Sequence, residues 1–243
     1  MSLALSIIIP TLNEEQVLGK ALVRLEDHKN SELIEVIVVD GGSSDTTLAI
    51  AKEAGCRTIF SPRGRGRQMN AGVTAARGEV LLFLHADTLL PDNFSQRILN
   101  AVCLPSFAAG AFSLAIASPA RSLATIAWFA NLRSRWLQLP YGDQALFVTR
   151  DTFNAVGGFP EMAIMEDFVF IQKLKKAGRI IILPERVMTS ARRWQNIGIV
   201  RTTLINQAIV CGYGLGVPPV ILARWYRRMR GVGRQPQCER KKP

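Results

Sequence analysis

The first hundred residues alternate between short apolar runs and segments with helical periodicity. Residues 3–10, 34–40 and 79–84 are almost continuously apolar, and the shorter stretch 57–60 also favours a strand. The segments that follow these runs have apolar residues at helical spacing, at 14–26, 45–54, 67–77 and 91–102. Buried strands that alternate with helices are typical of a parallel sheet covered on both faces. The sequence therefore predicts an α/β fold, with a Rossmann-like, mostly parallel sheet and helices on both faces.

The second half of the chain has a less regular pattern. It predicts strands at 108–117, 144–150 and 180–184, and helices at 118–137 and 167–177. Residues 202–223 carry no charge and are numerous enough to span a bilayer. Polar Asn206 and Gln207, three glycines and two consecutive prolines interrupt this segment. We therefore favour a helix pair that packs on the domain or lies at a membrane surface, with a membrane span as the alternative.

The net charge of +11 is concentrated at the C-terminus. From Arg224 onward there are eight Lys or Arg residues and one acidic residue. A basic tail of this kind can bind nucleic acid, an anionic membrane surface or a phosphorylated ligand, or it can simply be solvated. Nucleic-acid binding is disfavoured, because stacking on bases needs aromatic residues within the basic stretch and only Trp225 and Tyr226 are available.

The cysteines give information on the cellular compartment. Cys56, Cys103, Cys211 and Cys238 show no C-x-x-C spacing, which disfavours a zinc site or a disulfide framework and favours reduced thiols. The apolar N-terminal segment has no basic leader and no cleavage site, so it predicts a first strand rather than a signal peptide. The expected location is cytoplasmic, with a peripheral position on the inner face of a membrane as the alternative in which the tail binds lipid.

Polar stretches follow the first four predicted strands, with the sequences PTLNE, DGGSSD, SPRGRGR and HADT. Ligands of open α/β sheets bind beyond the carboxyl ends of the strands, so these stretches are expected to converge on one crevice. In the second stretch, Asp40 precedes a Gly-Gly turn whose backbone N–H groups could approach a nucleotide closely. A purely structural turn, with Asp45 as a helix N-cap, is the alternative.

The third stretch has the composition of a diphosphate site. Arg63, Arg65 and Arg67 occupy alternate positions in a glycine-rich loop that precedes a helix. Guanidinium groups beside a helix N-terminus suit a diphosphate, although a solvated basic loop is the alternative. If the segment is helical, Arg67, Asn70 and Thr74 share one face.

Two further segments supply carboxylates suited to metal binding and proton transfer. Asp87 follows an apolar strand, so its carboxylate is expected at the sheet rim, where it could share Mn²⁺ or Mg²⁺ with a diphosphate. His85 points the same way in an extended backbone. The alternatives are a helix-capping role for Asp87 and a packed position for His85. Glu166 and Asp167 open a helix, either for dipole reasons or because a carboxylate there acts as a general base toward an attacking hydroxyl.

Taken in order, the motifs SIIIPTLNE, VVDGGSSD, LLFLHADT, GGFPE with MEDFVF, and ARRW resemble those of the family 2 glycosyltransferases with the GT-A fold. The resemblance covers roughly residues 4–195 and is strongest to the short bacterial members. It implies a nucleotide-sugar donor, a divalent metal, a hydroxyl acceptor and a direct displacement that inverts the anomeric carbon. It also implies a nucleotide-sugar-binding half at 1–100, an acceptor-binding half at 101–200, and a C-terminal helical segment with a basic tail at 201–243.

The resemblance assigns donor-binding roles to the first two loops. In the family the first loop touches the nucleoside, and Pro10, Thr11 and Glu14 match it. Asp40 matches the first acidic position of the second loop. Many members have a second Asp there that helps to read the base, whereas this chain has Gly41, which leaves the base open.

The resemblance also assigns the diphosphate and metal positions. Arg67 matches a basic position near the diphosphate, and Asn70 follows it on the same predicted helix face. Asp87 matches the last, metal-binding Asp of the family's D-x-D motif. His85 occupies the first position of that motif and is a second candidate metal ligand, and Ala86 between them is expected to line the donor site.

The remaining matches concern the reaction and the acceptor. Asp167 matches the catalytic base, with Glu166 beside it, and Arg193 and Trp194 resemble an Arg-Trp pair near the acceptor or the diphosphate. The expected activity is an inverting, metal-assisted sugar transfer, with an acceptor that the uncharged segment and the basic tail suggest is lipid-linked. The alternative is a non-catalytic protein that binds a nucleotide or an anionic membrane surface. A sugar nucleotidyltransferase is disfavoured, because no glycine-rich basic loop follows the first strand.

Overall fold

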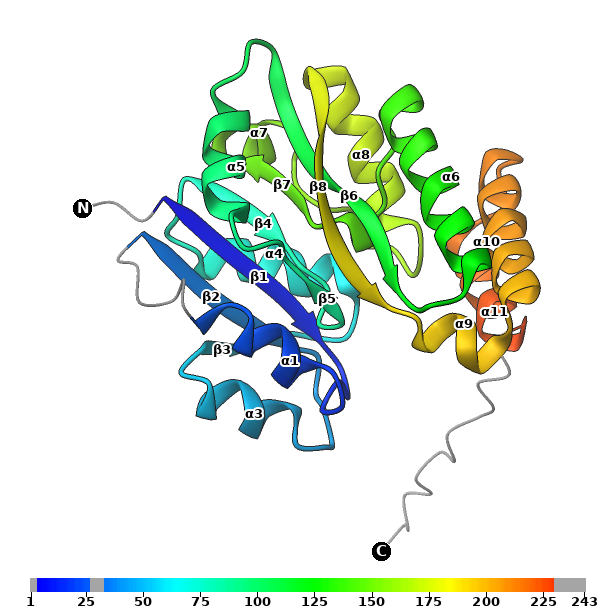
Figure 1. Cartoon of the computed structure of the whole chain (residues 1–243), viewed down its shortest axis with the longest axis horizontal. Coiled ribbons are helices and arrows are strands. Elements are labelled where there is room, and N and C mark those ends of the chain that lie inside the picture. The colour runs from blue at the N-terminus through cyan, green and yellow to red at the C-terminus, as the bar shows by residue number, and fades with distance from the viewer. Residues whose placement is uncertain (1–3, 27–32, 230–243) are drawn as a thin grey trace, which may run out of the picture. The chain divides into compact units, whose positions relative to one another are not determined.

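The computed structural model of the chain describes residues 4–26 and 33–229 (Figure 1). These residues divide into two compact units. The first unit holds the residues up to Glu161 together with Met165–Ala191, and the second holds Met162–Ile164 and the residues from Arg192 onward. The predicted functional boundaries after residues 100 and 200 fall inside helices, so the functional division of the chain stays a prediction.

A mixed sheet of eight described strands forms the centre of the first unit, in the order β3-β2-β1-β4-β7-β6-β8-β5. The strands are β1 (Leu5–Thr11), β2 (Ile34–Asp40), β3 (Arg57–Phe60), β4 (Val80–Phe83), β5 (Thr88–Leu89), β6 (Phe107–Ala117), β7 (Leu146–Thr149) and β8 (Arg179–Ser190). Strands β1 to β4 pair in parallel, as predicted. Strand β7 is antiparallel to both of its neighbours, and β5 is antiparallel to β8. The predicted α/β fold is confirmed, with its antiparallel pairings confined to these two strands.

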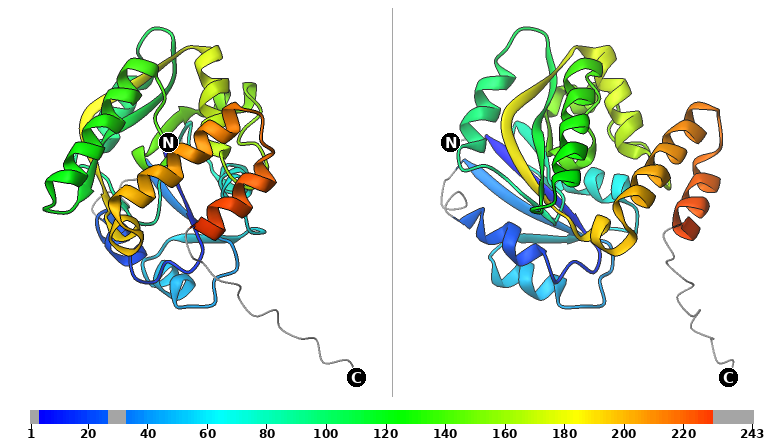
Figure 2. Two further views of the ribbon diagram at one scale, coloured as in Figure 1. Left: turned by 90° about the vertical axis from the view of Figure 1, so that its right-hand side faces the viewer. Right: turned by 45° about the vertical axis from the view of Figure 1, so that its right-hand side comes forward.

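Helices cover both faces of this sheet (Figures 1 and 2). The helices of the first unit are α1 (Leu18–Val23), α3 (Thr47–Glu53), α4 (Arg65–Ala75), α5 (Phe94–Val102), α6 (Arg121–Leu137), the 3-10 helix η1 (Gly142–Gln144), α7 (Arg150–Ala155) and α8 (Glu166–Ala177). Buried side chains of α1, α3 and α5 form one apolar cluster with the strands, and those of α4, α7 and α8 form another. On β1, Ile7 and Ile9 belong to the first cluster and Ile8 to the second. This double burial explains why the strand is continuously apolar.

The structure differs from the predicted elements in three places. The helix expected from residue 14 begins at Leu18, after a turn at 15–17, and the backbone N–H of Glu14 donates to the Thr47 hydroxyl at 2.8 Å. The strand expected at 180–184 continues to Ser190, because it pairs with β6 along nearly its whole length. Strand β5 was not predicted, since two residues carry no detectable periodicity.

The second unit contains α9 (Arg192–Ile197), α10 (Ile199–Gly214) and α11 (Pro219–Met229). Helices α10 and α11 pack closely, since a Cβ atom at Gly212 would lie 2.8 Å from the Leu222 side chain. The chain turns between them at Gly216, which has a φ of +84°. The predicted helix pair is therefore present, and within the described ranges no helix is long and apolar enough to cross a membrane.

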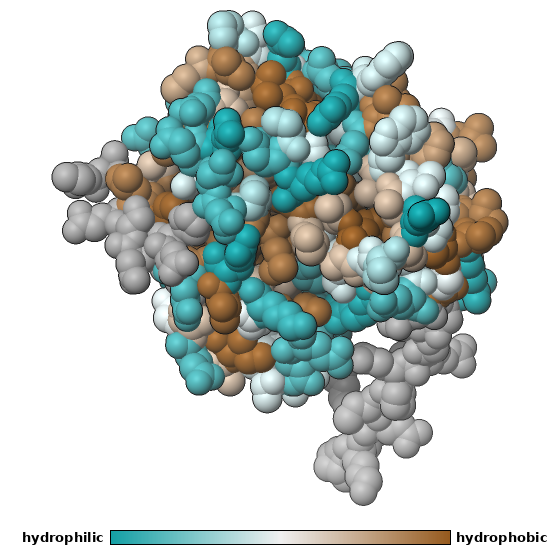
Figure 3. Space-filling model, in the orientation of Figure 1, coloured by the Kyte–Doolittle hydropathy of each residue, from teal (hydrophilic) through white to brown (hydrophobic). Residues whose placement is uncertain are grey.

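The surface in the view of Figure 1 mixes hydrophilic and hydrophobic residues (Figure 3). Among the exposed large hydrophobic side chains of the described chain are Trp128, Phe129 and Trp136 on α6. The opposite side of this helix is buried at Leu123 and Ala127. Helix α6 therefore has apolar residues on two sides, one packed against the sheet and the other exposed to solvent.

Gly72 on α4 is predicted to be a sensitive packing position. A Cβ atom there would lie 2.3 Å from Ile8 Cγ2 and 3.1 Å from Val39 Cγ2. We expect Gly72→Ala to lower the free energy of unfolding by about 1–3 kcal/mol, because the buried sheet face cannot accept the added methyl group without distortion. The matched helical change Gly19→Ala, where the nearest atom is 3.8 Å away, should be neutral or stabilising by up to about 1 kcal/mol. Urea unfolding of both variants measures the difference, and equal stability would contradict the close packing.

Candidate active site

The carboxylate of Asp40 organises the turn that follows β2. Asp40 is only 1% exposed. Its Oδ2 accepts hydrogen bonds from the backbone N–H groups of Gly42 and Ser43 at 2.8 and 2.9 Å, and its Oδ1 accepts from the Ser43 hydroxyl. The hydroxyl of Thr11 lies 3.5 Å from the same Oδ1. The structural turn is thus present, and a direct contact of Asp40 with a nucleotide stays a prediction.

The loops after β1 and β2 are joined into one structure. The side-chain Oδ1 of Asn13 accepts from the Ser44 N–H at 2.9 Å, and Glu15 Oε2 accepts from the Thr46 N–H at 3.1 Å. The Asp45 carboxylate accepts from the Thr47 N–H at 3.0 Å. Burial would raise the pKa of Asp45, but hydrogen bonds from Thr47 and from the Glu15 backbone outweigh this effect and lower the pKa.

The hydrogen bonds between the two predicted nucleotide loops join them into a single rim, in which Pro10 and Glu14 of the first loop are half-buried.

Gln68 on α4 ties this rim to the neighbouring helix, and the sequence reasoning missed it. Its side-chain nitrogen donates to the backbone carbonyls of Thr11 and Val39, both at 2.8 Å. A Cβ atom at Gly41 would lie 3.2 Å from the same nitrogen. The Gly41 that replaces an acidic residue of the family thus lies against a buried amide. The available signal in the sequence was the position of Gln68, a polar residue on the same helical face as Met69, Gly72 and Val73.

The predicted diphosphate loop lies at the N-terminus of α4 with its arginines partly exposed. Arg63 Nη2 reaches the Gly42 carbonyl at 3.5 Å. Arg65 and Arg67 form ion pairs with Glu166 at 3.5 Å and with Glu161 at 2.8 Å, and their side chains remain 44% and 51% exposed. All three guanidinium groups are thus held near the loop while keeping surface available to an anion.

Asn70 has a clear structural function. Its side chain donates to the Phe159 carbonyl at 2.9 Å and accepts from the Phe159 N–H at 3.0 Å. The Asn70 amide therefore satisfies both backbone groups of Phe159 and holds the GGFPE loop against α4. The contact of Asn70 with the donor stays a prediction. Such a contact would have to form while both hydrogen bonds to the Phe159 backbone are kept.

The HADT stretch follows β4 at the same edge of the sheet. The backbone carbonyl of Asp87 accepts from the Ser190 N–H at 3.1 Å, which fixes the backbone there. Among the side chains and backbone N–H groups that the structure describes, which do not include the side chains of Arg193 and Asn196, none donates to the half-buried Asp87 carboxylate. Ala86 is buried. Over the same ranges no group of three His, Cys, Asp or Glu side chains could hold a metal by itself, so a metal would need ligand oxygens in addition to Asp87.

His85 and Asp167 meet at Gly142. The Gly142 N–H donates to Asp167 Oδ2 at 3.1 Å. A Cβ atom on Gly142 would lie 2.9 Å from His85 Nε2 and 3.4 Å from Asp167 Oδ2. The absence of a side chain at this glycine thus lets an imidazole and a carboxylate approach one point from two elements. The sequence reasoning missed Gly142, although a glycine inside the YGDQ stretch was a visible signal.

Tyr141 and Arg133 form the wall beside this point. The Arg133 guanidinium lies 3.5 Å from the centre of the Tyr141 ring, within cation–π distance. Burial raises the pKa of Tyr141. The negative charge of Asp167 acts in the same direction, and Arg133 opposes both. The tyrosine is therefore kept neutral, and the positive charge of Arg133 lies over its ring.

Glu166 differs from its neighbour Asp167. Glu166 is 6% exposed, and its carboxylate faces Arg65. Burial raises the pKa of Glu166, Arg65 lowers it, and the charge of Asp167 raises it further, so that the net pKa lies above the ordinary value of 4.5. Asp167 is half-buried, and its other oxygen accepts from the Phe168 N–H at 2.7 Å. Of the two, Asp167 is the more accessible to an acceptor.

Arg193 and Trp194 lie on α9 in the second unit. Trp194 is buried, and the Arg193 side chain lies outside the described part of the chain. Their predicted roles near the acceptor or the diphosphate stay predictions.

Solved structures share this fold. The mannosyltransferase PcManGT from Pyrobaculum calidifontis, in complex with GDP-Man and Mn²⁺, superposes with a TM-score of 0.65 over 96% of this chain and 74% of that one, at 17% identity. This likeness confirms the expected GT-A architecture.

Curated relatives match a shorter region. A dolichyl-phosphate beta-glucosyltransferase of Drosophila melanogaster is 38% identical over 109 residues, which is 37% of this chain and 33% of the relative. A glucosyl-3-phosphoglycerate synthase of Petrotoga mobilis is 30% identical over 95 residues, which is 34% of this chain and 29% of the relative. The matched region thus spans about a third of the length of these relatives.

The family comparison covers more of the chain. Residues 6–159 match glycosyl transferase family 2. This range contains the joined nucleotide loops, the arginine loop, the HADT stretch and Gly142. The chain belongs to glycosyl transferase family 2.

Proposed function

We propose that the chain transfers a sugar from a nucleotide-sugar donor to an acceptor hydroxyl with inversion of the anomeric carbon. The observation that carries this proposal is the meeting of His85 and Asp167 at Gly142, at the sheet edge that also holds the nucleotide loops. A carboxylate that can accept a proton thus stands beside a predicted donor-binding rim. One base suffices for a single inverting displacement.

The donor is bound by the joined loops and the arginine loop in this proposal. Backbone N–H groups near Asp40 and the first loop, with Pro10, Thr11 and Glu14, would contact the nucleoside. Arg67 and its neighbours would contact the diphosphate, because guanidinium forks match phosphate oxygens. The GDP-Man in the Pyrobaculum structure supports a nucleotide-sugar as donor class.

A divalent metal fits the chemistry of the HADT stretch. The Asp87 carboxylate receives no hydrogen bond from the side chains and backbone N–H groups that the structure describes, and Mn²⁺ or Mg²⁺ binds carboxylate oxygens together with diphosphate oxygens. When bound, the metal would offset the negative charge that develops on the leaving nucleoside diphosphate. His85 is the second candidate ligand, and Ala86 would line the donor site.

Asp167 acts as the general base, and Glu166 supports it. The half-buried Asp167 carboxylate accepts the proton of the attacking hydroxyl. The Gly142 N–H fixes the orientation of that carboxylate. Glu166 is too deeply buried to reach an acceptor, so it holds Arg65 beside α8.

A lipid-linked acceptor and a peripheral position on the cytoplasmic side of a membrane agree with the uncharged segment 202–223 and the basic sequence after residue 223. The named Drosophila relative acts on dolichyl phosphate. A panel of nucleotide sugars with Mn²⁺ or Mg²⁺ in a thermal-shift assay identifies the donor, because a bound ligand raises the unfolding temperature by mass action.

Asp87→Ala is expected to abolish metal-dependent donor turnover, because the variant lacks the carboxylate that would share the metal with the diphosphate. Turnover of the identified donor, titrated with Mn²⁺, measures the effect. Asp92→Ala removes an exposed carboxylate paired with Arg24 and serves as the matched control with normal turnover. Wild-type activity of Asp87→Ala would exclude the metal role.

Asp167→Asn is expected to retain donor binding and to lose transfer by about two to four orders of magnitude, the usual contribution of a general base. Asparagine can still accept the Gly142 N–H, so the local structure should persist. Donor affinity by calorimetry and single-turnover transfer rates separate the two effects. If the rate is normal, the base lies elsewhere.

Glu166→Gln is expected to stabilise the protein relative to wild type increasingly as pH rises. The folded-state pKa of Glu166 lies above its ordinary value of 4.5. The contribution of protonated Glu166 to the free energy of unfolding is therefore fully present at a pH below that value, and it is lost as the pH rises through the folded-state pKa. Gln removes this loss. Unfolding temperatures at about pH 4 and about pH 7 should show the trend, which should exceed that of the exposed-carboxylate variant Glu161→Gln. A constant difference across pH would contradict the assignment.

A further inference from the structure

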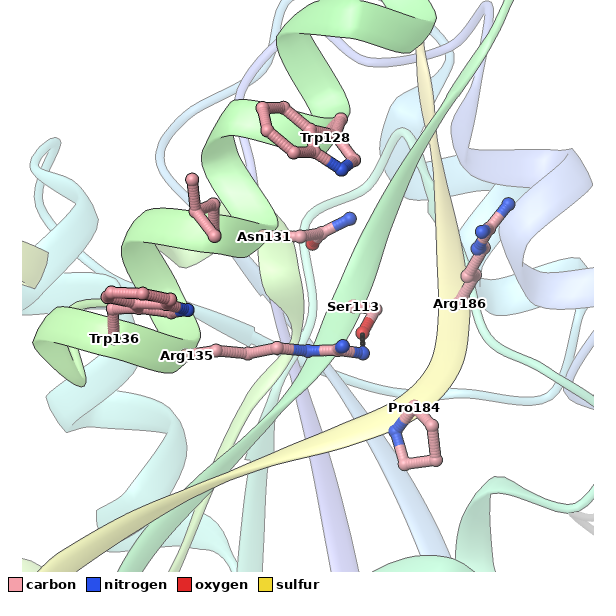
Figure 4. Close-up of a pocket in the computed structure, with 8 residues that line it drawn as sticks. Ser113, Trp128, Asn131, Arg135, Trp136, Pro184 and Arg186 are labelled. Carbon is pink, nitrogen blue, oxygen red and sulfur yellow. Dashed lines mark hydrogen bonds between the residues drawn. The ribbon is translucent and has the colours of Figure 1, made fainter.

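A second cavity lies on the outer side of the first unit, between α6 and the strands β6 and β8 (Figure 4). Its volume is about 220 Å³. The lining residues are Ser113, Trp128, Asn131, Leu132, Arg135, Trp136, Pro184 and Arg186. None of the residues assigned above to the donor, the metal or the base lines it. The proposed sugar transfer therefore leaves this cavity unexplained.

The floor of the cavity is a fixed structure. The pairing of β6 with β8 shifts register between Phe112 and Ser113, where Ser113 pairs with Arg186. The buried Ser113 hydroxyl donates to the Leu183 carbonyl at 2.8 Å. Asn131 accepts from the Leu114 N–H at 2.6 Å and donates to the Leu114 carbonyl at 3.0 Å, so α6 is fastened to the strand edge. The cavity exists before any ligand binds.

The charge of the cavity is positive. Arg135 Nη2 donates to the Ser113 hydroxyl at 3.2 Å, and Figure 4 shows this side chain reaching from α6 toward the strands. Arg186 reaches it from β8. No acidic residue lines the cavity, and among described residues neither guanidinium group has an ion-pair partner. Helix α6 has three arginines and no acidic residue. The site thus fits an anion.

Large apolar side chains surround this positive cavity. Trp128, Phe129 and Trp136 are 58%, 59% and 80% exposed, and Leu137 at the end of α6 is 58% exposed. Trp128 and Trp136 also line the cavity itself. Exposed aromatic residues on a globular surface mark a contact with another phase or molecule. Tryptophan is enriched at the boundary between lipid headgroups and hydrocarbon, because its ring is apolar and its N–H is polar.

We propose that the α6 face binds the surface of an anionic phospholipid bilayer, with a headgroup phosphate between Arg135 and Arg186 and the rings of Trp128 and Trp136 in the headgroup region. Charge complementarity selects this occupant, since the face combines aromatic rings with guanidinium groups that have no ion-pair partner among the described residues, and α6 carries no acidic residue. The inference does not rest on the proposed sugar transfer. It adds a membrane contact that involves neither the helix pair nor the basic tail.

Vesicle co-sedimentation of the full chain tests the proposal, with the basic tail present in every variant. Wild type is expected to bind phosphatidylcholine vesicles containing phosphatidylglycerol more tightly than pure phosphatidylcholine vesicles. The double change Trp128→Ala with Trp136→Ala should weaken binding by about tenfold or more, because two large rings no longer leave water. The double change Arg135→Glu with Arg186→Glu should remove the preference for anionic vesicles, since each cation near the surface contributes and the new charges are repelled.

Matched controls lie elsewhere on the first unit. Leu104→Ala changes another exposed apolar residue, and Arg179→Glu reverses another exposed arginine, so both should bind like wild type. Circular dichroism during thermal unfolding shows whether each variant is folded, and nucleotide-sugar binding should be unchanged in all of them. Absence of nucleotide-sugar binding by the wild-type protein, together with normal vesicle binding, would count against the proposed function alone.

Three outcomes would overturn the proposal. One is wild-type vesicle binding by both double variants, which would assign any membrane contact to other parts of the chain. The second is displacement by soluble inorganic phosphate together with normal binding of the tryptophan variant, which would make the cavity a site for free anions. Capture of a protein partner that needs the same tryptophans, without vesicle binding, would likewise exclude the bilayer as the occupant.

Discussion

The buried side-chain amide of Gln68 holds together the parts on which the candidate active site depends. Its two hydrogen bonds reach the backbone carbonyls of Thr11 and Val39, at the ends of two adjacent parallel strands. A buried amide donor that lost these partners would pay its full desolvation cost. Helix α4 is therefore fixed in register with the strand ends. The arginine loop at its N-terminus is placed beside the nucleotide rim for the same reason.

Helix α4 is also connected to α8, which carries the proposed general base Asp167, by a few direct contacts. Asn70 fastens the Phe159 backbone, and Arg65 meets Glu166 at the start of α8. A Cβ atom at Gly66 would lie 2.7 Å from the Pro160 carbonyl, so only glycine lets the loop pack this closely. Gly142 also permits close packing, because the His85 imidazole and the Asp167 carboxylate both approach the position that a Cβ atom would occupy there. Small residues bring the backbone close, and polar side chains then fix it.

The α6 face is connected to this site by a second buried amide. Gln144 Nε2 donates to the Phe112 carbonyl at 2.9 Å, and Gln144 Oε1 accepts from the Ser134 hydroxyl of α6 at 2.7 Å. Gln144 ends the 3-10 helix that begins at Gly142. A rigid connection therefore runs from the proposed membrane face to the proposed base.

Patterns along the chain predicted the α/β class, the parallel N-terminal strands and the sheet edge where the polar stretches gather, because hydrophobic periodicity is a local property of a chain. They also marked Asp40, Asp87 and Asp167 as carboxylates at element ends. The antiparallel β7, the extension of β8 and the approach of His85 and Asp167 to Gly142 became visible only in the folded structure. These depend on contacts between residues far apart in the chain, made possible by the space that Gly142 leaves, and no local pattern encodes such a contact.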